Sequence, residues 1–374
     1  MATRFGLLST FPPTQCGLAT FTHALAHHLQ QAGQRANVIR VVDTPQPAVP
    51  LVSHQLVTGR DGFARDAAAA LNACDVAILQ HEYGIFGGQD GQDVLAVLER
   101  VTVPVITVLH TVLARPTPHQ HEVLGRVLEG SDVAVTMTEA GRRRVIEGWG
   151  AGPGSVVVIP HGAHDNRASD DGVPRNARPT VLTWGLLGPG KGIEWALEAF
   201  SLLTDLDPLP LYRVVGQTHP RVVEHHGEAY RDELVAQVEA LGISAMVEFD
   251  ARYLDVPALQ ATIRAADIVL LPYDSLDQVT SGVLTEAVVA GRPVISTPFP
   301  HALELLSGGA GALVPRADPE AMAAALRRVL TRPGVAASMA AEARELAPTL
   351  LWSAVAGEYV RLSRGLRSRT PSVA

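Results

Sequence analysis

The chain has 374 residues, enough for two or three domains whose cores need neither disulfides nor metals. Hydrophobic residues make up 47% and charged residues 18%, which excludes a disordered or fibrous chain. The net charge of −8 argues against a general nucleic-acid binder, because phosphates attract an excess of basic side chains.

The apolar runs and the cysteine content of the sequence indicate the cellular compartment of the protein. The sequence contains no run of 18 apolar residues, so a transmembrane segment is not expected. Residues 1–8 lead directly into a strand-like run and lack the pattern of a secretory signal peptide. Cys16 and Cys74 are too few for a disulfide framework. We therefore expect a cytoplasmic protein for which peripheral membrane contact stays open.

Lysine occurs once among the 30 basic residues, as Lys191. A compact ammonium beside a phosphate is chemistry that arginine does not reproduce. Alternatively, the single lysine has no special role and occurs by chance. The count of lysines alone does not decide between a phosphate-binding role and chance.

Short apolar runs alternate with helix-length segments in the first half, which predicts a doubly wound α/β domain over residues 1–165. The expected helix Gly17–Gln31 has one apolar stripe. The expected strands are Arg4–Thr10, Ala36–Val42, Asp75–His81, Pro104–Thr111, Val133–Thr136 and Val156–Pro160.

His161–Pro179 is polar and has no apolar period, so it is interpreted as a linker. A second α/β domain follows over residues 178–348. Its expected strands are Thr180–Trp184, Leu211–Gly216, Val247–Phe249, Ile268–Leu271, Val294–Thr297 and Ala312–Val314. Its expected helices are Lys191–Leu203, Gly227–Leu241, Val256–Ala266, Thr280–Ala290 and Pro319–Leu330.

The pattern of Met339–Leu366 is helical, and we expect a helix at about residues 350–366 that packs back on the first domain. Two such domains in tandem would face each other across a cleft. Parallel sheets bind ligands beyond the carboxyl ends of their strands, so the cleft is the expected site.

Glycine-rich turns follow the first strand of each half. In the second half, Thr183–Glu194 contains Lys191 where a helix opens, and in the first half Gly17 begins a helix. Helix N-termini present unpaired N–H groups to anions, so the two turns could hold a diphosphate between them. A plain tight turn is the alternative, and the spacing fits neither a Walker A loop nor a G-x-G-x-x-G fingerprint.

A third polar segment runs from Pro272 into the helix expected at Thr280–Ala290. Backbone N–H groups at Thr280–Gly282 could bind a phosphate, and Glu286 could accept hydrogen bonds from ribose hydroxyls. A capped helix with Glu286 in a salt bridge explains the pattern about as well.

Four motifs of the second half resemble the donor domain of the family 4 glycosyltransferases, also called group 1, which are retaining enzymes with the GT-B fold. The motifs are Trp184-Gly…Lys191-Gly, Val214-Val-Gly216, Val247-Glu-Phe…Ala266–Pro272 and Gly282-Val-Leu-Thr-Glu286-Ala…Gly291–Ile295. Ser9–Gly17 and Pro160–Gly162 also match the family, so the resemblance covers most of the chain.

The resemblance implies that a nucleotide diphosphosugar donor binds here. Lys191 would bind its diphosphate, Glu286 the nucleotide ribose, and Asp250–Leu254 would flank the base. The donor set that follows comprises Gly17, Gly185, Lys191, Gly216, Arg252, Tyr253, Ser281, Gly282, Val283, Leu284 and Glu286.

Two positions depart from the family pattern. Gln278 stands where the family usually has the first Glu of Glu-x7-Glu, with Asp277 beside it, which weakens recognition of sugar hydroxyls by a carboxylate. Leu186 and Leu187 follow Gly185 where an arginine is typical. Without that arginine, Lys191 would be nearly the only cationic side chain that contacts the diphosphate.

The first half should supply the acceptor side of the site. His81, Glu82 and Tyr83 follow one strand, and His110 follows the next. In related enzymes a histidine at the position of His110 lies close to the transferred sugar. The predicted catalytic set is His110, Glu82 and Gln278, although His110 as a core histidine and Glu82 as a loop-stabilising carboxylate remain alternatives.

Metal chemistry is not expected. The pairs His23/His27 and His225/His226 have no third ligand at zinc spacing, and no Asp-x-Asp motif is present.

The predicted function is metal-independent transfer of a hexosyl group from a nucleotide diphosphosugar to a hydroxyl acceptor, with no cofactor and with retention. A nucleotide-sugar epimerase of the same fold and a non-catalytic sugar-nucleotide binder are the alternatives. The donor base and sugar, the acceptor and the oligomeric state are not predicted.

Overall fold

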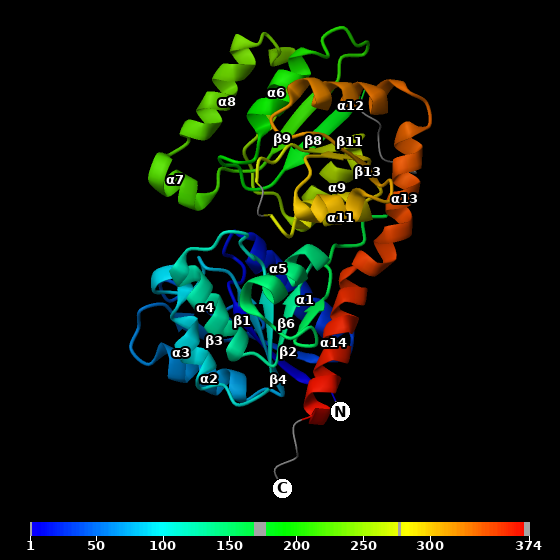
Figure 1. Ribbon diagram of the computed structural model, residues 1–374. Coiled ribbons are helices and arrows are strands. Elements are labelled where there is room, and N and C mark those ends of the chain that lie inside the picture. The colour runs from blue at the N-terminus through cyan, green and yellow to red at the C-terminus, as the bar shows by residue number, and fades with distance from the viewer. Residues whose placement is uncertain (1, 168–176, 276–277, 370–374) are drawn as a thin grey trace. The chain divides into compact units, whose positions relative to one another are not determined.

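The computed structural model describes residues 2–167, 177–275 and 278–369, which form two compact units (Figure 1). Unit 1 comprises Met1–Gly162 together with Trp352–Ala374, and unit 2 comprises Ala163–Leu351. Each unit has its own parallel sheet and its own hydrophobic core.

Unit 1 is built on a seven-stranded sheet with strand order β3-β2-β1-β4-β5-β6-β7, in which all pairings are parallel. The strands are β1 Arg4–Ser9, β2 Arg35–Val42, β3 Val52–Val57, β4 Val76–His81, β5 Val105–Leu109, β6 Val133–Thr136 and β7 Val156–Val158. The helices are α1 Gly17–Gln31, α2 Phe63–Asn72, α3 Val94–Leu98, α4 Pro118–Glu129, α5 Glu139–Trp149 and α14 Trp352–Arg369, with a short 3-10 turn at Gln89–Gly91.

Helices α1 and α14 pack together and cover one face of this sheet (Figure 1). Phe21 and Leu25 of α1 lie one turn apart, so they contribute to one buried stripe. Trp352 and Tyr359 of α14 join the same core cluster. The last described helix of the chain therefore completes the core of the unit that the chain begins with.

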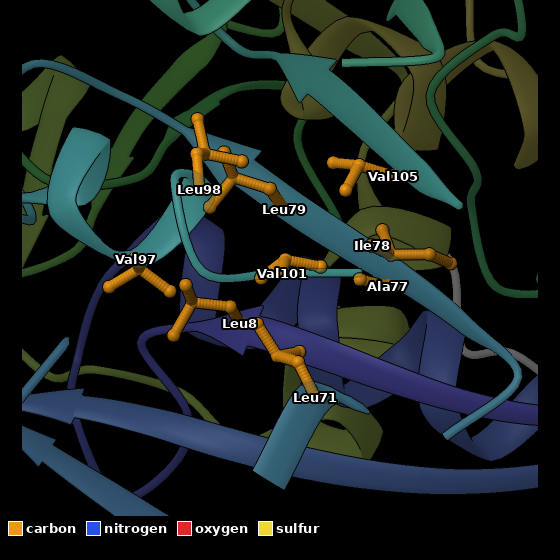
Figure 2. Close-up of a pocket in the computed structure, with 9 residues that line it drawn as sticks. All are labelled: Leu8, Leu71, Ala77, Ile78, Leu79, Val97, Leu98, Val101 and Val105. Atoms are coloured by element: carbon orange, nitrogen blue, oxygen red, sulfur yellow. The ribbon is translucent and has the colours of Figure 1, made fainter. Parts of the chain in front are cut away.

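The opposite face of the same sheet encloses the cavity drawn in Figure 2. Nine side chains line it, all of them apolar: Leu8, Leu71, Ala77, Ile78, Leu79, Val97, Leu98, Val101 and Val105. Ligand sites combine apolar walls with a few convergent polar groups, which these side chains do not supply. The cavity is a packing void beneath α2 and α3, away from the polar ends of the strands.

Unit 2 has a six-stranded parallel sheet with strand order β10-β9-β8-β11-β12-β13. The strands are β8 Thr180–Trp184, β9 Leu211–Val215, β10 Val247–Asp250, β11 Ile268–Leu271, β12 Val294–Ser296 and β13 Gly311–Leu313. The helices are α6 Ile193–Ser201, α7 Pro220–His226, α8 Ala229–Ala240, α9 Val256–Ala265, α10 Gly282–Val289, α11 Pro300–Leu306, α12 Pro319–Thr331 and α13 Val335–Leu350, with a 3-10 turn at Ser244–Met246.

Several elements differ from their predicted bounds. Strand β3 was not expected, because its sequence Val52-Ser-His-Gln-Leu-Val57 mixes polar and apolar residues without a clean period. Met339–Leu366 forms most of α13 and most of α14 rather than one helix, since Leu351 is extended (φ −69°, ψ 140°). Helix α6 begins at Ile193 instead of Lys191, because Gly192 adopts a left-handed conformation and caps it.

Candidate active site

Lys191 lies in the turn between β8 and α6, with its ammonium 4.5 Å from the centre of the Tyr273 ring. Burial lowers the pKa of the Lys191 ammonium. Among the described residues, no carboxylate lies within ion-pair distance of it. A buried cation held only by a ring face is strongly stabilised when an anion arrives.

Glycines let three segments of backbone approach closely around this turn. A Cβ on Gly216 would lie 2.0 Å from the carbonyl oxygen of Gly185, and one on Gly192 would lie 1.9 Å from that of Pro272. Gly216 and Gly192 also have φ values of +135° and +66°. The structure therefore accounts for Gly216 by packing, while Gly185 lies directly after β8.

The N-terminus of α10 presents its own N–H groups. Ser281 caps the helix, because its hydroxyl accepts from the N–H of Leu284 (3.2 Å), and its own N–H donates to Nδ1 of His301 (2.8 Å). Of the predicted phosphate donors Ser281–Leu284, two already have partners. Helix geometry leaves the N–H groups of Gly282 and Val283 for an anion. The helix begins at Gly282 rather than at Thr280.

Glu286 lies on α10 one turn after these groups. Burial raises the pKa of its carboxyl to about 7, opposed by a hydrogen bond with Trp184 at the end of β8. Among the described residues, no cation forms an ion pair with it. Glu286 is thus a carboxyl tied to the same strand end as Gly185 rather than one half of a surface salt bridge.

The residues expected to flank the base and the sugar are more exposed. Arg252 pairs with Asp250 at 2.6 Å and holds the pKa of that carboxyl down to about 2, and Tyr253 is 41% exposed. Gln278 is half-buried, and Asp277 lies outside the described residues. No described contact brings Gln278 to Glu286.

His110 directly follows β5 in unit 1 and contacts the Phe21 ring edge-on at 4.8 Å. Its Nε2 lies 2.6 Å from Oε1 of Gln80, and with the amide oriented this way Nε2 donates the hydrogen bond and Nδ1 keeps a lone pair. Burial, with His161 and His81 nearby, lowers the pKa of His110 to about 3. The imidazole is neutral.

Polar side chains at the end of β4 lie beside it. Thr111 donates a short hydrogen bond to Glu82, and the rings of His81 and Tyr83 meet at 5.1 Å. Burial lowers the pKa of His81 to about 4. Glu82 and His110 therefore belong to one cluster at the carboxyl ends of β4 and β5.

Gly17 begins α1 in the same unit. The preceding Cys16 is the N-cap, and its Sγ accepts from the N–H of Ala19 at 3.4 Å. Gly17 is exposed, and a Cβ there would meet no atom within 4 Å. Packing therefore does not explain this glycine.

The sequence analysis did not predict three contacts: Tyr273 beneath Lys191, Trp184 on Glu286, and His301 on the N–H of Ser281. Tyr273 and Trp184 both stand at strand ends, a position that could have marked them. His301 begins no motif of its own and has no comparable signal.

The described residues contain no group of three or more His, Cys, Asp or Glu side chains that could hold a metal ion. None of their helices is both long and apolar enough to cross a bilayer.

Known sequences and structures resemble this chain. Residues 166–346 match the family described as Glycosyl transferases group 1. The chain is 29% identical over 322 residues to D-inositol 3-phosphate glycosyltransferase of Kineococcus radiotolerans, covering 76% of this chain and 71% of that one. It is 25% identical over 281 residues to phosphatidyl-myo-inositol mannosyltransferase of Mycolicibacterium smegmatis, covering 71% and 66%.

The solved structures agree on the fold. Anabaena HepE in complex with UDP and glucose superposes with a TM-score of 0.76 at 16% identity, covering 97% of this chain and all of that one. Sucrose-phosphate synthase of Thermosynechococcus elongatus gives 0.76 at 19% identity, covering 98% and 100%. Among the sequence relatives, the match to D-inositol 3-phosphate glycosyltransferase of Rhodococcus jostii covers only 59% of that relative's length. Residues 166–346 thus belong to the group 1 glycosyltransferases, and the two parallel-sheet α/β units and these neighbours show the GT-B fold.

Proposed function

We propose that the protein transfers a hexosyl group from a nucleotide diphosphosugar to a hydroxyl acceptor, with retention at the anomeric carbon and without a metal ion. The observation that carries this proposal is the desolvated ammonium of half-buried Lys191, which has no carboxylate partner among the described residues. Glycosyl transfer from such a donor expels a diphosphate, so a fixed cation at the leaving group stabilises the transition state.

The donor half of the reaction belongs to unit 2 in this proposal. Lys191 and the N–H groups of Gly282 and Val283 would reduce the charge of the departing diphosphate. Glu286 would accept from the nucleotide ribose, and Arg252 and Tyr253 would flank the base. Glycosyl transfer passes through a state resembling an oxocarbenium ion, which the nearby diphosphate itself stabilises.

The acceptor half belongs to unit 1. Because His110 is neutral, it would position a sugar hydroxyl through the Nδ1 lone pair rather than stabilise charge. Glu82, held by Thr111, would orient the acceptor hydroxyl or take its proton. His81 and Tyr83 would line the same end of the sheet, and Gln278 would contact the sugar from unit 2.

Support for the substrate class comes from relatives. The curated relatives are named for inositol phosphate and phosphatidylinositol, and HepE was solved with UDP and glucose. We infer a nucleotide diphosphohexose donor and a polyol acceptor for this chain, acting in the cytoplasm.

The test follows product formation and donor binding separately. A panel of nucleotide diphosphosugars is incubated with polyol acceptors in excess EDTA, and the product is analysed by NMR for its anomeric configuration. His110→Ala and Glu82→Ala should keep their affinity for nucleoside diphosphate but transfer sugar about 10²-fold more slowly, because positioning acts in the transition state. An exposed neighbour, Glu122→Ala on α4, is the control.

Other outcomes would replace the proposal. Loss of activity in EDTA that a divalent ion restores removes metal independence, and an inverted product removes retention. An epimerised sugar identifies an epimerase, and tight binding without any product identifies a sugar-nucleotide binder.

A further inference from the structure

Arg40 on β2 is a buried cation that the proposed reaction does not use. Its side chain is 2% exposed, and it lies near the carboxyl end of its strand, under the exposed loop that precedes α1. Its Nη2 donates to Oγ1 of Thr14, but Nε and Nη1 have no hydrogen-bond partner. Among the described residues, no carboxylate forms an ion pair with it.

The hydrogen bond that Arg40 does make is weak. Its length is 3.3 Å, beyond the usual range for N–H···O, and its acceptor is the hydroxyl of an exposed residue. Desolvation also lowers the pKa of Arg40. A shielded guanidinium with two unused N–H nitrogens destabilises the protein unless an anion satisfies it.

Neighbouring strands bring further polar groups to the same row. Ser9 of β1 is the register partner of Arg40, so the two side chains point to the same face of the sheet. The hydroxyl of Ser9 is buried and has no hydrogen-bond partner. Leu8 pairs with Leu79, which makes Gln80 the next neighbour across the sheet, and Nε2 of Gln80 is also buried and unpartnered.

These groups share one chemical property. The guanidinium and the amide nitrogen can only donate hydrogen bonds, and the serine hydroxyl can donate as well. A ligand that satisfies all of them must carry several acceptor oxygens and a negative charge. Guanidinium matches phosphate and carboxylate oxygens in a two-pronged geometry.

We propose that Arg40 and Ser9, extended by Gln80, form an oxyanion-binding site in unit 1 that takes a phosphate or carboxylate group. The oxyanion replaces Thr14 as the partner of the guanidinium, whose N–H groups and the Ser9 hydroxyl then donate to its oxygens. The site is made by residues of unit 1 alone, whereas the donor features belong to unit 2. Its occupancy does not depend on the transfer reaction being the one proposed above.

The first experiment measures anion-dependent stability of the full chain without any nucleotide. Thermal unfolding is recorded in sodium phosphate, in acetate, and in chloride at matched ionic strength. Phosphate or acetate should raise the melting temperature of the wild type. Arg40→Met should weaken that anion's apparent affinity at least about tenfold, as expected for loss of a charged hydrogen-bond donor.

Matched variants separate binding from structure. Arg35→Met removes an exposed arginine from the same strand and should keep the wild-type response. In chloride, Arg40→Met should be at least as stable as the wild type, because it removes an uncompensated buried charge. If Arg40→Met does not fold, Ser9→Ala, which keeps the charge, should still weaken the anion response several-fold.

The proposal is overturned if neither anion stabilises the wild type beyond chloride. It is also overturned if Arg40→Met responds as the wild type does, or if Arg40→Met and Thr14→Ala both destabilise the protein in chloride by a similar amount. The last result would make Arg40 a support for the loop only. Two sources of the oxyanion are then distinguished by kinetics: an acceptor-borne group makes inorganic phosphate competitive with the acceptor, and a separate effector leaves the acceptor KM unchanged.

Discussion

Removing the ammonium of Lys191 should weaken donor binding more than it changes stability. Lys191→Met keeps most of the side-chain volume beside Tyr273 and deletes the charge that lies 4.5 Å from the ring centre. A hydrogen bond to a charged group is worth about 1.5–3 kcal/mol, so the affinity for a nucleoside diphosphate should fall about 10- to 150-fold. Loss of the cation–π contact, about 0.5–2 kcal/mol, opposes relief of the burial cost, so unfolding should change by about 1 kcal/mol or less.

Isothermal titration with UDP and GDP, together with urea unfolding, measures both quantities. Lys191→Arg separates charge from shape, because a guanidinium does not reproduce the compact ammonium beneath a phosphate. Arg328→Ala removes one positive charge at an exposed site on α12 and should leave affinity unchanged. Wild-type affinity and turnover in Lys191→Met would refute the assignment of this turn to the diphosphate.

Two further predictions concern Glu286 and Gly162. The pKa of Glu286 is raised to about 7 in the fold from 4.5, so the native state holds the extra proton and stability should fall by up to about 3 kcal/mol as pH rises through that window. Denaturant unfolding at a series of pH values should show this loss of stability in the wild type and in the control Glu320→Gln, which changes an exposed carboxyl. Glu286→Gln should abolish the loss. If Glu286→Gln keeps the wild-type pH dependence, the carboxyl of Glu286 is not the desolvated group. Gly162→Ala would place a Cβ 2.2 Å from the Trp352 ring and should destabilise unit 1 by about 1–3 kcal/mol. The control Gly148→Ala on α5 has nothing within 4 Å of its new Cβ and should be neutral or stabilising. Equal melting temperatures for the two variants would contradict the packing of Gly162 against Trp352.

Much of the fold could be predicted because parallel sheets buried on both faces leave a plain signature. Strands β8 and β11 are buried at every residue, and their predicted bounds match the structure. β3 lies at the edge of its sheet with most of its residues partly exposed, so no apolar run marks it. The break between α13 and α14 depends on the backbone of Leu351, which apolar spacing does not encode.

The sequence could indicate where the candidate site residues stand along the fold but not which side chains they contact. Glycine turns located Lys191 and the start of α10, because backbone N–H groups and tight turns have sequence signals. The Tyr273 ring beneath Lys191 comes from a segment 82 residues away, a contact that only the sheet order creates. The unpaired Nε and Nη1 donors of Arg40 likewise could not be predicted, because they can be identified only when every neighbouring acceptor is known.

Unit 1 is made of two separate stretches of the chain, so it cannot complete its fold until the second stretch has been synthesised. A ribosome makes β1 to β7 first, but the apolar face of α1 finds its partner only after α14 has been made, about 190 residues later. During that interval the nascent first unit exposes the surface that Trp352 and Tyr359 later cover, while the contiguous second unit can complete its core. Folding of the early half must therefore wait for the late half, and a fragment ending at Gly162 should aggregate where Ala163–Leu351 made alone should not.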